Sequence, residues 1–271
     1  GTFITSNGIL VLRGNITMPN RRPLPSLKLV GTPRFRPFRC VWMLEELRDA
    51  LPAALDFKYQ HSPAEPQSVE ARECHPMGKV PSLLVRDLID GEFTLVESAA
   101  INSWLGDRMR EYVCHPGAFL VPPSGSRDRA MYDSFVQLLM AEVDSSGLWI
   151  HRKLESLGEK KAFGAVRYAL LPARLQFDRA MVGVRAQLAL QRELAASLDG
   201  TVYFLVGSHF TAADILLVHC CDWAASIEVD KGGWFSKYKD DALFQNYLCA
   251  MRSRPAYMRT KMIQTHSPNL H

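Results

Sequence analysis

A single proline, Pro81, constrains the fold of this chain more than any other residue. It stands in the stretch Met-Gly-Lys-Val-Pro-Ser-Leu-Leu at residues 77–84, between a Gly-Lys turn and an apolar run. Proline has no backbone N–H, so it suits the first residue of a strand or a cis peptide bond that turns the chain. The stretch therefore predicts a turn that leads directly into a strand.

A second signal follows at residues 97–101, where Glu97 and Ser98 precede Ala-Ala-Ile. The pair is placed to open a helix, and the free N–H groups at a helix N-terminus can hold a carboxylate. Glu97 adds a negative partner for an ammonium group. Together they suit a ligand end that carries both charges, although a helix cap with a solvated acid fits the same pattern.

From residue 27 onward the pattern alternates between strands and helices. The Asp90-Gly91 step is a hairpin signal, and Pro37 suits the first turn of a helix. We expect strands at 27–31, 56–60, 80–85 and 93–96. We expect a helix at 37–47, a loop or short helix at 61–75 and another helix at 98–107. This order is that of a thioredoxin-like domain, which we assign to residues 27–113.

Proline and glycine then interrupt the chain between residues 114 and 126, which marks a boundary. Beyond it the apolar spacing is helical, and residues 126–265 are expected to form an all-helical domain. Thr211 and Asp214 stand three residues apart before an apolar run, which predicts a capping box with a structural role. The helices are expected at 127–156, 160–198, 211–224 and 241–263.

Residues 1–26 are treated as an N-terminal extension. Apolar runs at residues 9–12 and 16–18 flank a Gly-Asn step and predict a hairpin. No acidic residue precedes Glu45, whereas seven Arg or Lys residues do. An acid-free basic segment is typical of an organelle-targeting peptide, and a simple basic extension is the alternative.

Composition excludes several classes of protein. The chain has 271 residues, of which 47% are hydrophobic and 22% charged, as in an ordinary globular protein. No run approaches the roughly 18 apolar residues of a membrane span, and a net charge of +4 does not by itself indicate nucleic acid. The six cysteines show no CxxC spacing and no pattern of metal ligands. Reduced thiols and a cytoplasmic location are expected.

The motifs together resemble the glutathione transferase superfamily over residues 27–263. The helix that begins near Phe38 reads Phe-Arg-Cys-Val-Trp-Met-Leu-Glu-Glu-Leu, which is similar to bacterial and fungal members. The Thr211 capping box and the segment at 246–257 are similar to the family's second domain. The resemblance implies an α/β thioredoxin-like N-terminal domain followed by an all-α C-terminal domain, and a homodimer.

The same resemblance implies that glutathione is the co-substrate and assigns its binding residues. Pro81 would be cis, so that the backbone of Val80 pairs with the cysteinyl part of glutathione. Glu97 and Ser98 would hold the γ-glutamyl end. Lys79 would reach the glycyl carboxylate or stay solvated.

The resemblance also identifies a missing group. Family members activate the thiol of glutathione with a hydroxyl, because the thiolate is the nucleophile. The position of the active serine in similar members is occupied by Phe35, which cannot donate a hydrogen bond. Three explanations stay open: Thr32 donates instead; Arg34 or Arg36, with the helix N-terminus, stabilises the thiolate by charge; or glutathione is bound without turnover.

An electrophile pocket is expected between the two domains. The expected reaction is conjugation of glutathione to an apolar electrophile, as in detoxification. A non-catalytic ligand-binding or scaffold module and a glutathione-dependent disulfide reductase are the alternatives. Cys40 is expected to be a core residue and not a nucleophile. The candidate lining residues are Phe35, Tyr132, Phe135 and Trp149.

Overall fold

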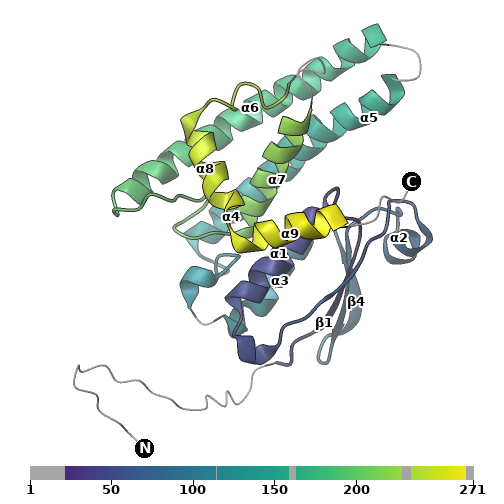
Figure 1. The fold of residues 1–271 in the computed structure, drawn as a ribbon, viewed down its shortest axis with the longest axis vertical. Helices are drawn as coiled ribbons and strands as arrows, with labels where there is room; N and C mark the ends of the chain where they lie inside the picture. The colour runs from purple at the N-terminus through teal and green to yellow at the C-terminus, as the bar shows by residue number, and fades with distance from the viewer. Residues whose placement is uncertain (1–21, 114, 159–162, 228–232, 267–271) are drawn as a thin grey trace, which may run out of the picture.

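The computed structural model describes residues 22–113, 115–158, 163–227 and 233–266. The hairpin expected near the N-terminus, and with it most of the proposed extension, lies outside these residues. The described chain consists of a four-stranded sheet with flanking helices, followed by a region of helices (Figure 1).

The sheet is mixed and has the strand order β2-β1-β3-β4. Strand β1 pairs in parallel with β2 and antiparallel with β3, and β3 forms the antiparallel hairpin with β4 that Asp90-Gly91 predicted. Gly91 has a φ of 79°, which glycine adopts without strain. The strands are β1 (Ser26–Val30), β2 (Gln60–Ser62), β3 (Ser82–Asp87) and β4 (Gly91–Val96).

The strand expected at residues 56–60 is wrong in position. Residues Ala53–Leu55 form a short 3-10 helix, and Asp56 follows it in the left-handed region with a φ of 45°. A residue in that conformation cannot begin an extended strand. Pairing with β1 therefore starts only at Gln60.

Three helices accompany the sheet: α1 (Pro37–Ala50), α2 (Val69–Cys74) and α3 (Ser98–Met109). Helices α1 and α3 lie between the sheet and the helical region, whereas α2 lies on the other side of the sheet (Figure 1). Helix α1 packs on β1, α3, α7 and α9, and every residue from Pro37 to Leu47 is buried. Cys40 is one of these core residues, as expected.

The helical region departs from the expected pattern at two places. The helix expected over 127–156 contains a π-helical segment, and Pro255 divides the helix expected over 241–263 because proline cannot continue a preceding helix. The elements are η2 (Arg110–Tyr112), η3 (Pro116–Ala118), α4 (Arg127–Leu138), the π-helix η4 (Leu139–Leu148), α5 (Trp149–Gly158), α6 (Phe163–Ala196), α7 (Ala212–Ser226), α8 (Ala242–Arg252) and α9 (Pro255–His266).

The predicted capping box is present at the start of α7. The Thr211 N–H donates to the Asp214 carboxylate at 2.8 Å. The same carboxylate accepts the Leu205 N–H at 2.7 Å and the Tyr247 hydroxyl at 2.8 Å. Asp214 therefore joins the extended segment before α7 to helix α8, and its role is structural.

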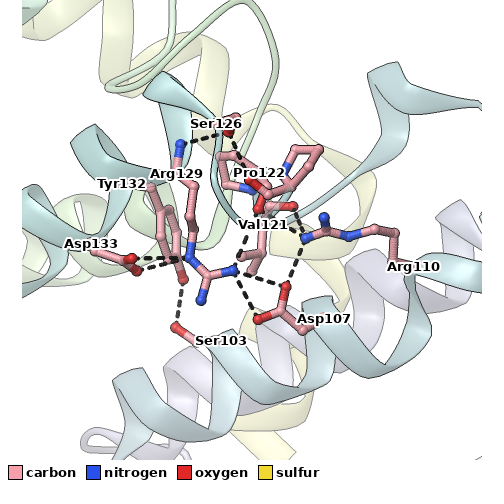
Figure 2. A network of polar contacts seen from close by, with 10 residues as sticks. Ser103, Asp107, Arg110, Val121, Pro122, Ser126, Arg129, Tyr132 and Asp133 are labelled. Atoms are coloured by element: carbon pink, nitrogen blue, oxygen red, sulfur yellow. Dashed lines mark hydrogen bonds and ion pairs between the residues drawn. The ribbon is translucent and has the colours of Figure 1, made fainter.

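A polar network connects the end of α3 with the start of α4 (Figure 2). The Arg129 guanidinium donates to both oxygens of Asp107, at 3.0 and 2.9 Å, and Arg110 donates to Asp107 at 2.7 Å. Close packing accompanies these bonds, because a Cβ atom at Gly106 would lie 2.3 Å from a methyl carbon of Val121. The change from sheet to helices falls at this junction, while the domain limits at 113 and 126 stay a prediction.

Two buried acids of α1 connect the sheet region to α9. Glu45 accepts a hydrogen bond from Arg259 at 2.6 Å, and Glu46 accepts two from Arg254 at 2.7 Å. Glu46 also accepts the indole N–H of Trp42 at 2.9 Å. Helix α9 therefore completes the surroundings of α1, although more than 200 residues separate them in sequence.

Candidate functional site

A cleft of about 400 Å³ opens between the sheet region and the helical region. Its walls come from the loop before α1, the turn before Pro81, and helices α5, α7 and α9. The described residues that line it are Arg34, Phe35, Arg36, Phe38, Pro66, Lys79, Val80, Trp149, Arg152, His219, Asp222, Trp223, Ser226, Lys261 and Gln264.

The Val80-Pro81 peptide bond is cis, as the sequence resemblance implied. Val80 and Lys79 line the cleft. The loop after β1 packs closely against this turn, because a Cβ atom at Gly31 would lie 2.9 Å from Cβ of Val80 and 2.6 Å from Cγ of Pro37. Gly31 also has a φ of 137°, so only glycine suits this position. The backbone at Val80 is thereby held beside the N-terminus of α1.

Glu97 and Ser98 begin helix α3 and have different surroundings. Glu97 is exposed with a φ of 68°, whereas Ser98 is buried and its hydroxyl accepts a hydrogen bond from Arg39 at 3.3 Å. Burial lowers the pKa of His75, and the charges of Glu97 and Lys79 act on it in opposite directions. Of the five expected glutathione-binding residues, Lys79 and Val80 line the cleft, whereas Pro81, Glu97 and Ser98 are not among its lining residues.

Of the three candidate thiol-activating residues, Arg34 and Arg36 line the cleft, whereas Thr32 does not. Thr32 is fully buried, does not line the cleft, and its hydroxyl has no hydrogen-bond partner among the described residues. Arg34 is exposed and lies 3.8 Å from a Glu65 carboxylate oxygen. Arg36 stands at the N-cap position of α1 without a side-chain capping bond, lines the cleft and keeps 24% of its side chain exposed.

Arg36 is anchored from the helical region by Asp144 of η4. Its Nε donates to Asp144 at 3.2 Å, and its terminal NH2 group makes a second contact with the same carboxylate. The guanidinium carbon lies 4.7 Å from the centre of the Trp149 ring and 5.9 Å from that of Trp223. A cation is thus fixed at the base of the cleft, next to the positive end of a helix dipole.

A second arginine, Arg39, shares the Asp144 carboxylate and is completely buried. Its NH2 group donates to Asp144 at 2.6 Å, and its Nε donates to Nδ1 of His219 at 3.1 Å. Although burial opposes the effect, the two arginines lower the pKa of Asp144 to about 2. Burial and the neighbouring Arg39 lower the pKa of His219 well below its usual value, so the imidazole is neutral. Two guanidinium groups therefore face one carboxylate, and the cluster is net positive.

Solved structures of known proteins share this architecture, although no protein-family model and no curated sequence match the chain. Ure2p in complex with glutathione is 19% identical with a TM-score of 0.64, and the match covers 89% of this chain and 100% of that one. Poplar glutathione transferase F1 is 17% identical with a TM-score of 0.62, over 89% and 99% of the two chains. BphK, a bacterial GST, is 20% identical with a TM-score of 0.60, over 88% and 99%. The chain has the glutathione transferase fold.

In this glutathione transferase fold the four expected pocket residues divide into two pairs. Phe35 and Trp149 line the cleft. Tyr132 does not, because it is fully buried and its hydroxyl lies 2.9 Å from that of Ser103 in the network between α3 and α4 (Figure 2). Phe135 is half-buried against the core and is also outside the cleft.

Sequence analysis missed several residues of the cleft. Trp223, His219 and Lys261 come from α7 and α9, which lie far along the chain from the Phe35 loop. In the sequence, these residues differ from their neighbours only in being polar or aromatic within apolar helices. That difference does not indicate which part of the fold their side chains contact. Arg39 and Asp144 give a stronger signal, because a charge inside an apolar helical stretch needs a buried partner.

The described residues contain neither a metal-binding cluster nor a helix suited to cross a membrane. Among them, no group of three or more His, Cys, Asp or Glu side chains is arranged to hold a metal ion. Within the same residues, no helix combines the length and the apolar character that a membrane crossing requires.

Proposed function

We propose that this chain binds glutathione in the cleft and transfers its thiolate to an apolar electrophile. The fold and the cleft at the cis Val80-Pro81 bond support the proposal, as does the solved structure of Ure2p, which has this fold and is in complex with glutathione. Lys79, Val80, Pro81, Glu97 and Ser98 are the proposed glutathione-binding residues. In the transfer, the sulfur forms a bond to the electrophilic carbon while that carbon releases a leaving group or a π electron pair.

The observation that carries the proposal is the position of Arg36. It places a cation at the N-terminus of α1 and at the base of the cleft, where a thiolate would gain from both the charge and the helix dipole. Thr32 cannot take this role in the same way, since its side chain is buried outside the cleft. Arg34 also lines the cleft, but its side chain is 40% exposed against 24% for Arg36. We therefore assign thiolate stabilisation to Arg36.

A non-catalytic carrier is the second candidate, and the hydroxyl content of the cleft favours it. Ser226 is the one described lining residue with a hydroxyl, and it donates to the Trp223 carbonyl at 2.7 Å. No cysteine is among the described lining residues, and burial raises the pKa of the Cys220 thiol to about 12. A disulfide reductase that uses a protein cysteine is therefore disfavoured, whereas glutathione-dependent disulfide reduction without an active cysteine stays an alternative.

The proposal extends to assembly and location. A homodimer is proposed, with the sheet region of one copy against the helical region of the other. A cytoplasmic location is proposed because the described cysteines, Cys40, Cys74, Cys220, Cys221 and Cys249, are free thiols, as in a reducing compartment.

Calorimetry with glutathione tests binding, and the ultraviolet absorbance of the bound thiolate against pH tests activation. We expect binding and a lowered thiol pKa in the wild-type protein. Arg36→Met should raise the pKa of the bound thiol by roughly 1–3 units, the usual effect of losing an adjacent cation. Arg36→Lys should restore most of the difference, and Thr32→Val should leave the thiol pKa unchanged.

The outcomes separate the alternatives. Absence of binding at millimolar glutathione would exclude the proposed function. Binding with an ordinary thiol pKa would leave the carrier. A thiol pKa that responds to Thr32→Val and not to Arg36→Met would show that the assignment of the activating group is wrong.

A further inference from the structure

The cleft has an unequal balance of charge. Five of its described lining residues are basic, and Asp222 is the one acidic residue among them. Asp222 is already engaged, because it accepts hydrogen bonds from Arg252 at 3.1 Å and from the Tyr257 hydroxyl at 2.9 Å. The cleft therefore attracts anions, and no lining carboxylate offers an uncommitted site to a cation.

The basic residues lie on opposite walls. Lys79 belongs to the turn where glutathione is proposed to lie, whereas Arg152 and Lys261 belong to α5 and α9 on the helical side. The helical side also carries the indole rings of Trp149 and Trp223, which are half-buried. This wall is thus both aromatic and positively charged.

Lys261 is the clearest of these cations. Its Nζ donates to the neutral amide oxygen of Gln264 at 2.6 Å and lies 5.5 Å from the centre of the Phe38 ring. No described carboxylate forms an ion pair with it. Arg152 also lines the cleft, and its guanidinium carbon lies 4.0 Å from the centre of the Phe35 ring. Both cations therefore lie near aromatic rings that belong to the lining of the cleft.

This arrangement favours one kind of second ligand. A neutral ring that filled the cleft would remove water from the Lys261 ammonium group without replacing its hydrogen bonds, which is unfavourable. A ring that carries a negative substituent would replace that water with a charge-assisted hydrogen bond. The same site would then distinguish a charged compound from its neutral analogue.

We infer that the helical side of the cleft takes an aromatic compound that bears an anionic group, with the ring against Trp149 and Trp223 and the anion at Lys261. The inference rests on the proposed function, since it gives the electrophile an apolar body and an acidic substituent. Glutathione would occupy the wall at Lys79 and Val80 at the same time.

Two fluorescent probes test this inference on the folded protein. 8-Anilinonaphthalene-1-sulfonate carries a sulfonate, and N-phenyl-1-naphthylamine has the same ring system without it. We expect the sulfonate to bind roughly fivefold or more tightly, with an affinity that falls as salt is added, whereas the neutral probe should be insensitive to salt.

Lys261→Gln should reduce this preference for the sulfonate to near zero and leave the affinity of the neutral probe unchanged. Lys261→Arg should keep the preference, because it keeps the charge. Lys239→Gln is the matched control, since it removes one exposed lysine outside the cleft and should change neither probe. An unchanged thermal unfolding temperature shows that each variant is folded.

Glutathione titrations in parallel keep the two hypotheses apart. Binding of the sulfonate to the glutathione-loaded protein would support the inference. Competition between glutathione and the sulfonate would overturn it, because the cations would then serve glutathione, and so would equal affinity for the two probes. A protein that shows no heat with glutathione but keeps the Lys261-dependent preference would refute the proposed function and leave the anion site standing.

Discussion

Asp144, which lies behind the cleft and pairs with Arg36 and Arg39, is the charged residue whose loss should affect stability most. Its side chain is 1% exposed, and it pairs with Arg39, whose side chain is 0% exposed, as well as with Arg36. Asp144→Asn would leave a buried guanidinium without its anion. Removal of one partner of a buried pair costs about 3–5 kcal/mol of unfolding free energy.

The pKa of Asp144 gives a lower limit for this effect. Its usual value is 3.8 and the folded value is about 2, a difference of nearly two units. At about 1.4 kcal/mol per unit, the charged carboxylate contributes roughly 2–3 kcal/mol relative to its protonated form. The larger figure for Asp144→Asn includes the additional cost of the unpaired Arg39.

Urea unfolding followed by tryptophan fluorescence at pH 7 measures this difference. Asp133→Asn is the matched control, because Asp133 pairs with Arg129 on the surface with 55% of its side chain exposed. An exposed pair of this kind is worth less than about 1 kcal/mol. If Asp144→Asn lay within about 1 kcal/mol of the wild type, the argument from the buried pair would be refuted.

The pH dependence has a definite sign. The folded pKa lies below the unfolded one, so the stabilisation by Asp144 is complete above about pH 4 and is lost as the pH falls toward 2. The difference between wild type and Asp144→Asn should therefore shrink across that interval. A constant difference down to pH 2 would contradict the assigned ionisation.

Four further changes test the packing and the buried hydrogen bonds. Gly106→Ala should destabilise the protein by about 1–3 kcal/mol, because the new methyl group collides with Val121 across the α3–α4 junction. Gly183→Ala has open space around it and should stabilise α6 by about 0.5–1 kcal/mol. Thermal unfolding measures both changes, and a stabilised Gly106→Ala variant would contradict the contact with Val121. Asp214→Asn should cost about 2–3 kcal/mol in urea unfolding, since the buried carboxylate accepts several hydrogen bonds, and a neutral result would argue against the capping network. Tyr132→Phe should lower the free energy of unfolding by about 1 kcal/mol, because it removes the hydrogen bond to Ser103. It should leave glutathione binding unchanged in calorimetry, and altered binding would indicate that Tyr132 contacts the ligand.

Local chemistry made part of the fold predictable. The hairpin at Gly91 and the capping box at Thr211 each depend on a few adjacent residues whose backbone preferences are specific. The cis bond before Pro81 was implied by the family resemblance, because the local residues suited the first residue of a strand equally well. The strand near residue 56 was misplaced because Asp56 adopts a left-handed conformation, which its sequence neighbours do not require.

The site was less predictable, because its residues meet only through tertiary packing. Arg39 and Asp144 are 105 positions apart, and nothing local to either one identifies the other. The aromatic residues show the same difficulty. Tyr132 and Trp149 both stand in apolar helical patterns, yet one is enclosed by the core and the other faces the cleft.

The ion pairs between α1 and α9 have a consequence for how the protein is made. Glu45 and Glu46 are synthesised more than 200 residues before Arg259 and Arg254. At a ribosomal rate of about 5–20 residues per second, these acids wait roughly 10–40 s for their partners. The sheet region therefore emerges from the ribosome before the arginines that pair with it, and its contacts are completed late. The sheet region can complete its folding only after α9 has left the ribosome.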